Sequence, residues 1–259
     1  MQNRLTVSLL QTNPAWKDTG KNLLDIEKKL LEVSSETDLV LLPEMFATGF
    51  VTDPADVAET MEGMTVQWLQ KMAKTKQVAL AGSLPIKVAN HYFNRFVFAA
   101  PSGKISFYDK RHLFAFAGED QHYTPGAAPL AITYKGWKLA PFVCYDLRFP
   151  VWSRNTNAYD VCLYVANWPS VRIDAWNALL KARAIENTSY CIGVNRVGKD
   201  GANLMYSGHS QVLGPLGEIL QKAPEEKEAL LTVELRKDHL VKTRKEFPFL
   251  ADRDIFQIE

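Results

Sequence analysis

The sequence predicts an α/β protein in which two β-sheets pack together and helices cover the outside. Apolar strand-like runs alternate with segments of helical periodicity, and hairpin signals interrupt this alternation. The hairpins exclude a purely doubly wound sheet, because that arrangement alternates strands with crossover helices. No repeat, linker or low-complexity segment divides the 259 residues. We therefore expect one domain over residues 1–259.

The expected strands are short apolar runs, several of which are bounded by turn residues. Pro43 stops one run just before Glu44, and Lys135-Gly136 forms a turn between two others. In chain order, the expected strands are residues 5–11, 38–42, 78–82, 93–100, 105–108, 131–134, 137–143, 161–166, 190–195, 210–213, 218–220 and 230–235.

The expected helices carry apolar residues at helical spacing. Asp18 or Thr19 is a candidate N-cap for the first helix, because a short polar side chain can accept a hydrogen bond from a free N–H of the first turn. The expected helices are residues 22–33, 65–75, 173–187 and 237–245, with a short helix after Pro150. Residues 113–129 show no clean period and are predicted to form a loop over the functional site.

Composition and charge exclude several classes of protein. The chain has 30 Lys and Arg against 29 Asp and Glu, a formal net charge of +1. Clustered basic residues, which a nucleic-acid surface requires, are missing, and so are phosphate-binding glycine motifs. The apolar run near the N-terminus is too short for a signal peptide, and no segment reaches transmembrane length. We expect a cytoplasmic protein without nucleic-acid or membrane partners.

The three cysteines differ in their surroundings. Cys162 and Cys191 lie inside apolar strand runs and are expected to be packed and unreactive. Cys144 ends an apolar run, and charged residues follow at once. The odd number and wide spacing argue against a disulfide framework, a zinc site or a redox pair, and they suit a reducing compartment. From spacing alone, Cys144 is either a nucleophile or a buried structural cysteine, and both interpretations stay open.

Two further polar residues share the position of Cys144. Glu44 and Lys110 each lie just beyond an apolar run, at residues 39–42 and 105–108. Because the ends of neighbouring strands meet at one rim of a sheet, the three side chains can converge. Taken singly, Glu44 is better explained as a surface glutamate after a proline, and Lys110 as a surface lysine in a basic doublet.

Three motifs resemble those of the nitrilase superfamily of carbon–nitrogen hydrolases. They are LLPEMF at residues 41–46, YDKRHL at residues 108–113 and VCYDLRFP at residues 143–150, in the order expected for that superfamily. Residues 208–218 also resemble its late hairpin. The resemblance implies a four-layer αββα sandwich with two mixed sheets and an amide hydrolase that needs no cofactor. The spacing of the cysteines gives no reason to expect a metal. It also implies a homodimer formed next to the cysteine motif, where residues 149–152 are apolar.

The resemblance also implies a catalytic triad. Cys144 would attack an amide carbon, Glu44 would act as general base and acid, and Lys110 would stabilise the oxyanion. The resemblance further implies that Glu119, as a second glutamate, positions the lysine and the substrate; a solvent-facing loop glutamate is the alternative. From the chemistry, the N–H of Tyr145 is a candidate second oxyanion donor. From its position at a strand end, Trp168 is a candidate pocket wall or an ordinary core aromatic.

Other polar residues near the motifs have more ordinary explanations. We expect Asp146 and Arg148 to form a structural ion pair that holds the turn. A Cys-His hydrolase would need His112 or His209 beside Cys144, and nothing in the spacing places either one there.

Within the superfamily, the chain looks most like the omega-amidase branch, through residues 165–169 (VANWP) and 181–187 (KARAIEN). This implies hydrolysis of short 2-oxo dicarboxylate monoamides, such as 2-oxoglutaramate or 2-oxosuccinamate, to the 2-oxo acid and ammonia. The substrate carboxylate would need a cation, and Arg111, Arg148 and Arg172 are the candidates. A nitrilase or an N-carbamoyl amino acid hydrolase shares the same triad and stays open. A noncatalytic protein of the same fold is disfavoured, because all three triad residues are present.

Overall fold

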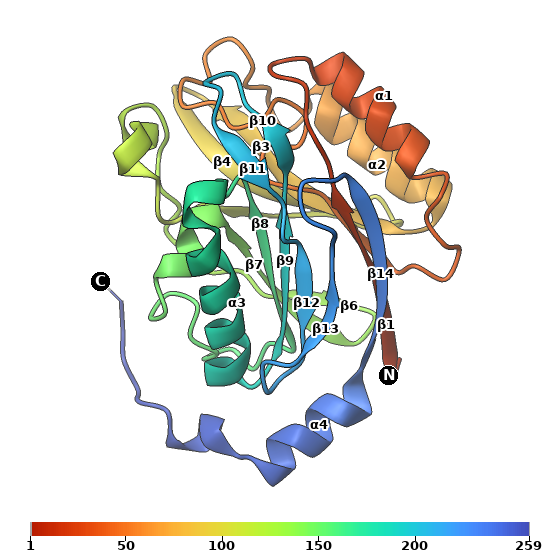
Figure 1. Cartoon of the computed structure of the whole chain (residues 1–259), viewed down its shortest axis with the longest axis vertical. Coiled ribbons are helices and arrows are strands. Elements are labelled where there is room, and N and C mark those ends of the chain that lie inside the picture. The colour runs from red at the N-terminus through yellow and green to blue at the C-terminus, as the bar shows by residue number, and fades with distance from the viewer. Residues whose placement is uncertain (1, 259) are drawn as a thin grey trace.

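The computed structural model describes residues 2–258, and within that range it contains two six-stranded mixed sheets packed face to face (Figure 1). The first sheet has the order β14-β1-β2-β3-β4-β5, and the second has the order β13-β12-β9-β8-β7-β6. The strands of the first sheet are β1 (Arg4–Gln11), β2 (Leu39–Leu41), β3 (Ala79–Val88), β4 (His91–Ala99), β5 (Ile105–Asp109) and β14 (Ala229–Arg236). Those of the second are β6 (Ile132–Tyr134), β7 (Trp137–Val143), β8 (Val161–Ala166), β9 (Tyr190–Asn195), β12 (Gln211–Leu213) and β13 (Ile219–Lys222).

Both sheets follow the same plan. Three parallel strands lie in the middle of each, β1-β2-β3 in the first and β7-β8-β9 in the second, and antiparallel strands flank them. Parallel strands bring their carboxyl ends to one edge of a sheet, which is where loops gather functional side chains.

Helices cover the outer face of each sheet (Figure 1). Helices α1 (Thr19–Lys29) and α2 (Met64–Lys76) lie on the first sheet, and α3 (Ile173–Asn187) lies on the second. Alternation along β2 shows the layering, since Leu39 and Leu41 face the second sheet while Val40 packs under α1 and α2. The predicted αββα sandwich is confirmed. A fourth helix, α4 (Lys237–Glu246), follows β14.

Several predicted boundaries differ from the structure. Helix α1 begins three residues earlier than expected, because the side chain of Asp18 accepts a hydrogen bond from Lys21 N at 3.0 Å. The expected helix after Pro150 is wrong: within the described chain a 3-10 helix at Cys144–Arg148 precedes that proline, and only a turn follows it. A two-stranded ribbon of β10 (Val197–Lys199) and β11 (Met205–Ser207) was not predicted.

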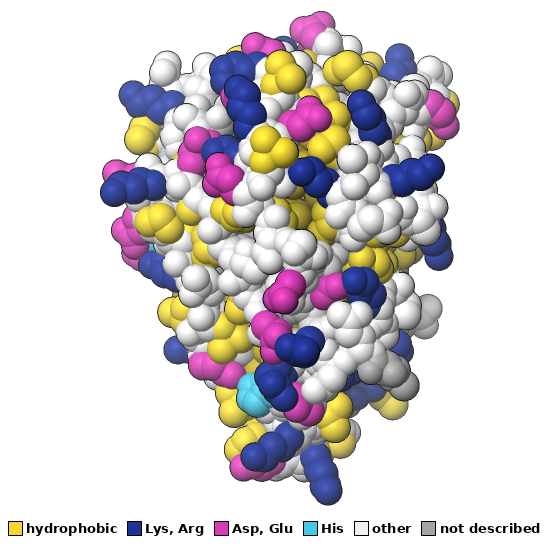
Figure 2. Space-filling view, turned by 90° about the vertical axis from the view of Figure 1, so that its right-hand side faces the viewer, with side chains coloured by type: hydrophobic (Ala, Val, Ile, Leu, Met, Phe, Trp, Pro, Cys, Tyr) yellow, Lys and Arg dark blue, Asp and Glu magenta, His cyan; other side chains and the backbone are white. Residues whose placement is uncertain are grey.

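The distribution of charged side chains on the surface agrees with the net charge of +1. On the face shown in Figure 2, basic and acidic side chains are interspersed and neither sign forms a continuous patch. Within residues 2–258, no helix has both the length and the apolar character required to cross a membrane.

Candidate active site

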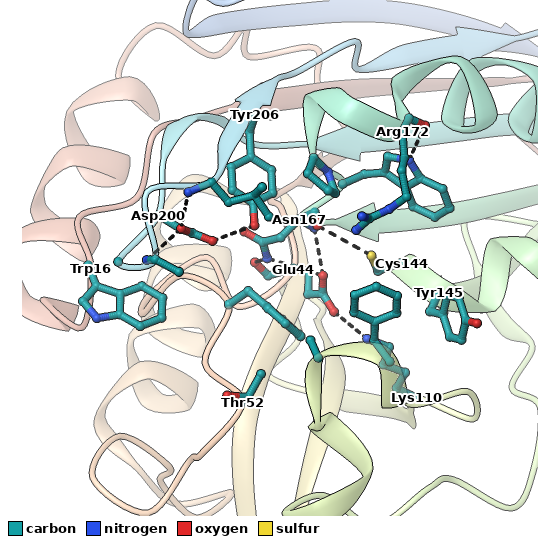
Figure 3. A pocket seen from close by; sticks show the side chains of 18 of the residues that line it. Trp16, Glu44, Thr52, Lys110, Cys144, Tyr145, Asn167, Arg172, Asp200 and Tyr206 are labelled. Atoms are coloured by element: carbon teal, nitrogen blue, oxygen red, sulfur yellow. Dashed lines mark hydrogen bonds and ion pairs between the residues drawn. The ribbon is translucent and has the colours of Figure 1, made fainter.

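Strand ends from both sheets meet at one pocket (Figure 3). Glu44 and Lys110 follow β2 and β5 of the first sheet, whereas Cys144 follows β7 of the second. All three line the same cavity of about 400 Å³. The structure thus brings the three sequence-predicted residues together at the seam between the sheets.

A buried charge cluster forms the floor of the pocket. Lys110 Nζ lies 2.9 Å from Glu44 Oε1 and 2.8 Å from Glu119 Oε2, and all three side chains are fully buried. Burial by itself lowers the pKa of Lys110, but the charges of Glu119 and Glu44 outweigh it and raise that pKa above its ordinary value. Burial raises the pKa of Glu119, against the opposing charge of Lys110. Lys110 is therefore a permanent cation at neutral pH.

Asn94 on β4 was missed by the sequence analysis. Its Nδ2 donates to Glu44 Oε1 at 2.8 Å and to Glu119 Oε1 at 3.0 Å, so one amide joins the two glutamates. The only signal in the sequence is a lone amide inside an apolar strand run, which must find polar partners once it is buried.

Asn167, at the end of β8, fixes the other side of Glu44. Its backbone N–H donates to Glu44 Oε2 at 2.8 Å, and its side-chain Nδ2 donates to the Glu44 carbonyl at 2.7 Å. Glu44 follows β2 of the first sheet and Asn167 follows β8 of the second, so these bonds cross from one sheet to the other. Both oxygens of the Glu44 carboxylate are held by named donors, which fixes its orientation toward the pocket.

Cys144 has an unusual backbone and an uncharged resting thiol. Its φ is +44°, a left-handed conformation that costs energy for a residue with a side chain. Its Sγ lies 3.9 Å from the carbonyl oxygen of Asn167, which accepts from the thiol. Burial raises the pKa of the Cys144 thiol, the charge of Glu44 raises it further, and Lys110 opposes both. Attack by this sulfur therefore requires a base that removes its proton.

The predicted ion pair between Asp146 and Arg148 is wrong. Asp146 is fully buried and accepts from Tyr108 Oη at 2.8 Å, Val143 N at 3.0 Å, and the backbone N and Nδ1 of His112 at 2.9 and 2.8 Å. These four donors occupy both carboxylate oxygens. Arg148 turns instead toward the pocket, with its guanidinium 4.9 Å from the centre of the Trp168 ring.

Some of the other residues predicted from the sequence line the pocket, and others do not. Tyr145 and Trp168 line it, together with Arg148 and Arg172, whereas Glu119 lies behind Lys110. Arg111 is not in the lining, and its Nη1 donates to the Gly126 carbonyl at 3.1 Å.

The two histidines have partners elsewhere. His112 binds Asp146, and His209 Nδ1 lies 3.1 Å from Asn177 Nδ2. Neither is among the residues that line the pocket. Across residues 2–258, no group of three or more His, Cys, Asp or Glu side chains is arranged to hold a metal ion.

The far wall of the pocket, formed by the β10–β11 ribbon and Trp16, was also missed. Asp200 Oδ1 accepts from the backbone N–H groups of Ala202 and Leu204, each at 2.9 Å, and Oδ2 accepts from Tyr206 Oη at 2.8 Å. Gly201 lies so close to Trp16 that a Cβ there would come within 2.3 Å of the indole. The Asp200-Gly201 dipeptide is the turn signal that could have revealed the ribbon.

Comparison with known proteins identifies the family. The model of the carbon–nitrogen hydrolase family matches residues 6–245. The chain belongs to that family. A solved structure of a carbon–nitrogen hydrolase superfamily protein from Xanthomonas campestris, with an arsenic adduct in its active site, matches this one with a TM-score of 0.97, at 39% identity and over 100% of both chains.

Two curated members of the carbon–nitrogen hydrolase family narrow the relationship. Omega-amidase YafV of Escherichia coli (strain K12) is 42% identical, and the match covers 98% of each chain. The 2-oxoglutaramate amidase of Bacillus subtilis (strain 168) is 31% identical, over 95% of this chain and 96% of that protein. The resemblance to the omega-amidase branch of the nitrilase superfamily is confirmed.

Proposed function

We propose that this carbon–nitrogen hydrolase is an omega-amidase that cleaves the terminal amide of short 2-oxo dicarboxylate monoamides. One observation carries the proposal. The pocket that contains Cys144, Glu44 and Lys110 also contains two guanidinium groups, from Arg148 and Arg172. A thiol, a carboxylate and a buried cation suit amide hydrolysis, and the arginines suit a substrate that carries a carboxylate at its other end.

The reaction follows from the arrangement of these groups. Glu44 removes the proton of the Cys144 thiol, and the sulfur attacks the amide carbon. Lys110, together with the N–H of Tyr145, stabilises the oxyanion that develops. Glu44 returns the proton to the nitrogen, the C–N bond breaks, and ammonia leaves a thioester on Cys144. Water, deprotonated by Glu44, then releases the 2-oxo acid.

Glu119 and Asn94 act by positioning. Glu119 accepts from Lys110 Nζ through both of its carboxylate oxygens, and Asn94 ties the two carboxylates together. Neither residue lines the cavity. They keep the cation and the base in one geometry while the substrate charge changes.

Arg148 and Arg172 supply the proposed carboxylate subsite. Among the described residues, neither has a carboxylate within ion-pair distance, and each lies over an aromatic ring instead: Arg148 over Trp168 at 4.9 Å and Arg172 over Phe114 at 5.2 Å. Cations that are held by apolar rings and are not neutralised gain most from an anionic ligand. Arg111, whose side chain is bound to Gly126, is the matched control.

We further propose that residues 1–259 act as one carbon–nitrogen hydrolase domain in the cytoplasm, as a homodimer. The free state of all three cysteines agrees with a reducing compartment. The amide substrate is the small-molecule partner, and the balanced charge offers no surface for nucleic acid.

The test is release of ammonia from a panel of amides, nitriles and carbamoyl compounds. We expect much higher kcat/KM for 2-oxoglutaramate and 2-oxosuccinamate than for butyramide, with nitriles as poor substrates. Cys144→Ala should stay folded and lose turnover, because it removes the nucleophile. A preference for nitriles or for N-carbamoyl amino acids would move the protein to another branch of the superfamily, and an active Cys144→Ala variant would refute the mechanism.

The carboxylate subsite is tested by charge removal. Arg148→Met and Arg172→Met should each lower kcat/KM for 2-oxoglutaramate by about tenfold or more, through a higher KM, and should change butyramide hydrolysis little. Arg111→Met should leave the ratio between the two substrates unchanged. If all three variants keep the wild-type ratio, the carboxylate is bound elsewhere.

A further inference from the structure

We propose that the pocket has a second lobe that receives the departing amine, so that the enzyme hydrolyses secondary monoamides with an apolar N-substituent as well as primary amides. This inference rests on the proposed function, because it takes the acyl half of the substrate from there. We define the amine lobe by Trp16, Phe50, Thr52, Ala202 and Leu204, with Asp200 as its charged member.

The two ends of the pocket differ in chemistry. Arg148 stacks on Trp168, and the Trp168 indole N–H donates to the carbonyl of Arg172 at 2.8 Å, so both cations belong to one end. Figure 3 places Arg172 and Tyr145 on one side of the view and Trp16, Thr52 and Asp200 on the other. The carboxylate end and the amine lobe are thus separate parts of one cavity.

The position of Glu44 decides which part of the substrate enters the lobe. In Figure 3, Glu44 lies between Cys144 and the side that carries Trp16 and Asp200. The group that protonates the leaving nitrogen must be within hydrogen-bond reach of it. With the carboxylate of the substrate at the arginines and its amide carbon at Cys144, the nitrogen faces Glu44. Any substituent on that nitrogen therefore points into the amine lobe.

The lining of the lobe defines what it accepts. Trp16 lies against Gly201, where a larger residue would clash, so the indole forms a flat apolar wall. Phe50 and Leu204 add apolar surface, and the cavity of about 400 Å³ is of the size that holds drug-sized ligands, larger than a five-carbon monoamide needs. The carboxylate of Asp200 disfavours a second anion. The lobe therefore fits aromatic or aliphatic amines that are neutral or cationic.

The chemistry balances without any added reactant. The Cys144 sulfur forms the thioester as the C–N bond breaks, and the nitrogen leaves with its substituent and the proton that Glu44 took from the thiol. Water then replaces the sulfur on the acyl carbon, which releases the 2-oxo acid and restores the thiol. The only difference from a primary amide is that an amine departs instead of ammonia.

The experiment compares three substrates on the same preparation. They are 2-oxoglutaramate, its N-benzyl derivative and its N-(4-carboxybenzyl) derivative, with release of ammonia, benzylamine or the carboxylated amine as the readout. We expect turnover of the first two and at least about tenfold lower kcat/KM for the third, since the last pair differ only in a carboxylate that meets Asp200.

Two variants change the size of the amine lobe in opposite directions, and each should weaken binding of the N-substituent. Trp16→Ala removes its apolar wall, and Ala202→Phe fills it; each should lower the ratio of N-benzyl to primary-amide kcat/KM by about tenfold or more. Phe249→Ala, an exposed aromatic outside the pocket, is the matched control and should leave the ratio unchanged. Because Ala202 is itself exposed, its variant should fold even if Trp16→Ala does not.

The outcomes separate this inference from the proposed function. Wild-type enzyme that hydrolyses 2-oxoglutaramate but not its N-benzyl derivative overturns the amine lobe and leaves the omega-amidase proposal standing. Activity on neither compound overturns the proposed function. Turnover of the N-benzyl compound with a ratio that neither variant alters places the substituent outside the lobe and also overturns the inference.

Discussion

Cys144 combines a strained backbone with a thiol that is neutral at rest. Its raised pKa means that the resting enzyme does not hold a thiolate, in contrast to cysteines whose pKa is lowered by a neighbouring histidine. The proposed base, Glu44, is itself one reason why that pKa is high. The same carboxylate thus suppresses the thiolate in the resting enzyme and accepts its proton in the reaction.

This dual effect predicts the direction in which the pKa of Cys144 changes when Glu44 loses its charge. Burial first and the charge of Glu44 second raise the pKa of Cys144, so thiolate forms only above the pH range of an ordinary thiol. Glu44→Gln removes the negative charge, lowers that pKa and shifts the pH profile of Cys144 alkylation by a small neutral reagent to lower pH, while amide hydrolysis is lost. Mass spectrometry of the labelled cysteine measures the rate at each pH.

The matched control for that experiment is the exposed Glu62, whose Gln variant should leave both the profile and the turnover unchanged. An alkylation profile that stays in place or moves to higher pH in Glu44→Gln would show that the Glu44 charge does not act on the thiol. Retained turnover would place the base elsewhere.

At the residue scale, the sequence predicts which functional side chains follow a strand. It does not predict the hydrogen-bond partners that fix their positions. Glu44, Lys110 and Cys144 each follow a visible apolar run and lie in motifs. Asn94 and Asn167 are equally close to the chemistry, but their partners are 50 and 123 residues away in the chain. The error on Asp146 has the same cause, because local spacing suggested Arg148 while the donors came from Tyr108 and His112.

At the element scale, Asp146 acts as a brace between two loops. One loop follows β5 and carries Lys110; the other follows β7 and carries Cys144. Asp146 belongs to the second loop and accepts from His112 in the first and from Val143 at the end of β7. One buried carboxylate therefore ties the loop of the cation to that of the nucleophile, and we infer Asp146 to be a positioning residue.

Asp146→Asn tests whether Asp146 positions the two loops. An amide has one acceptor oxygen, so whichever way it turns, its NH₂ faces donors that the carboxylate had satisfied, and each unsatisfied buried donor costs about 1–3 kcal/mol. We expect a lower Tm and a fall in kcat of about tenfold or more at nearly unchanged KM, together with slower alkylation of Cys144. Asp120→Asn, on the exposed loop, is the control. A lower Tm with normal kcat would make Asp146 merely structural.

The elements that were predicted well are those whose signal is local. Helix α3 and strand β9 have the predicted bounds, because helical spacing and a continuous apolar run define them without help from distant contacts. The β10–β11 ribbon has three residues in each strand and depends on Trp16 and on the Asp200 turn. A helix is predicted after Pro150, where proline would suit a first helical position, but the chain there forms only a turn.

At the scale of the whole molecule, dimerisation stays a prediction, and the structure changes its details. Of the apolar segment at residues 149–152, Trp152 is buried and donates to Tyr108 Oη at 2.9 Å, whereas Val151 is 57% exposed. Light scattering at micromolar concentration should give twice the mass of one chain. Val151→Glu should shift it toward the monomer, and Leu31→Glu, which is 73% exposed but lies next to α1, should not. A wild-type monomer would contradict the prediction.

Because the pocket lies between the two sheets, activity requires that both sheets are folded and packed together. The part before residue 113 contains the proposed base and cation, and the part after residue 129 contains the nucleophile, so neither fragment holds a working set. The last strand, β14, pairs along the whole of β1 and closes the sheet that carries the base. Catalysis thus depends on assembly of both parts: we expect a chain cut in the 113–129 loop to give two inactive pieces, with hydrolysis returning only when the pieces associate. Measured turnover therefore indicates that both parts have folded and that β14 has paired with β1.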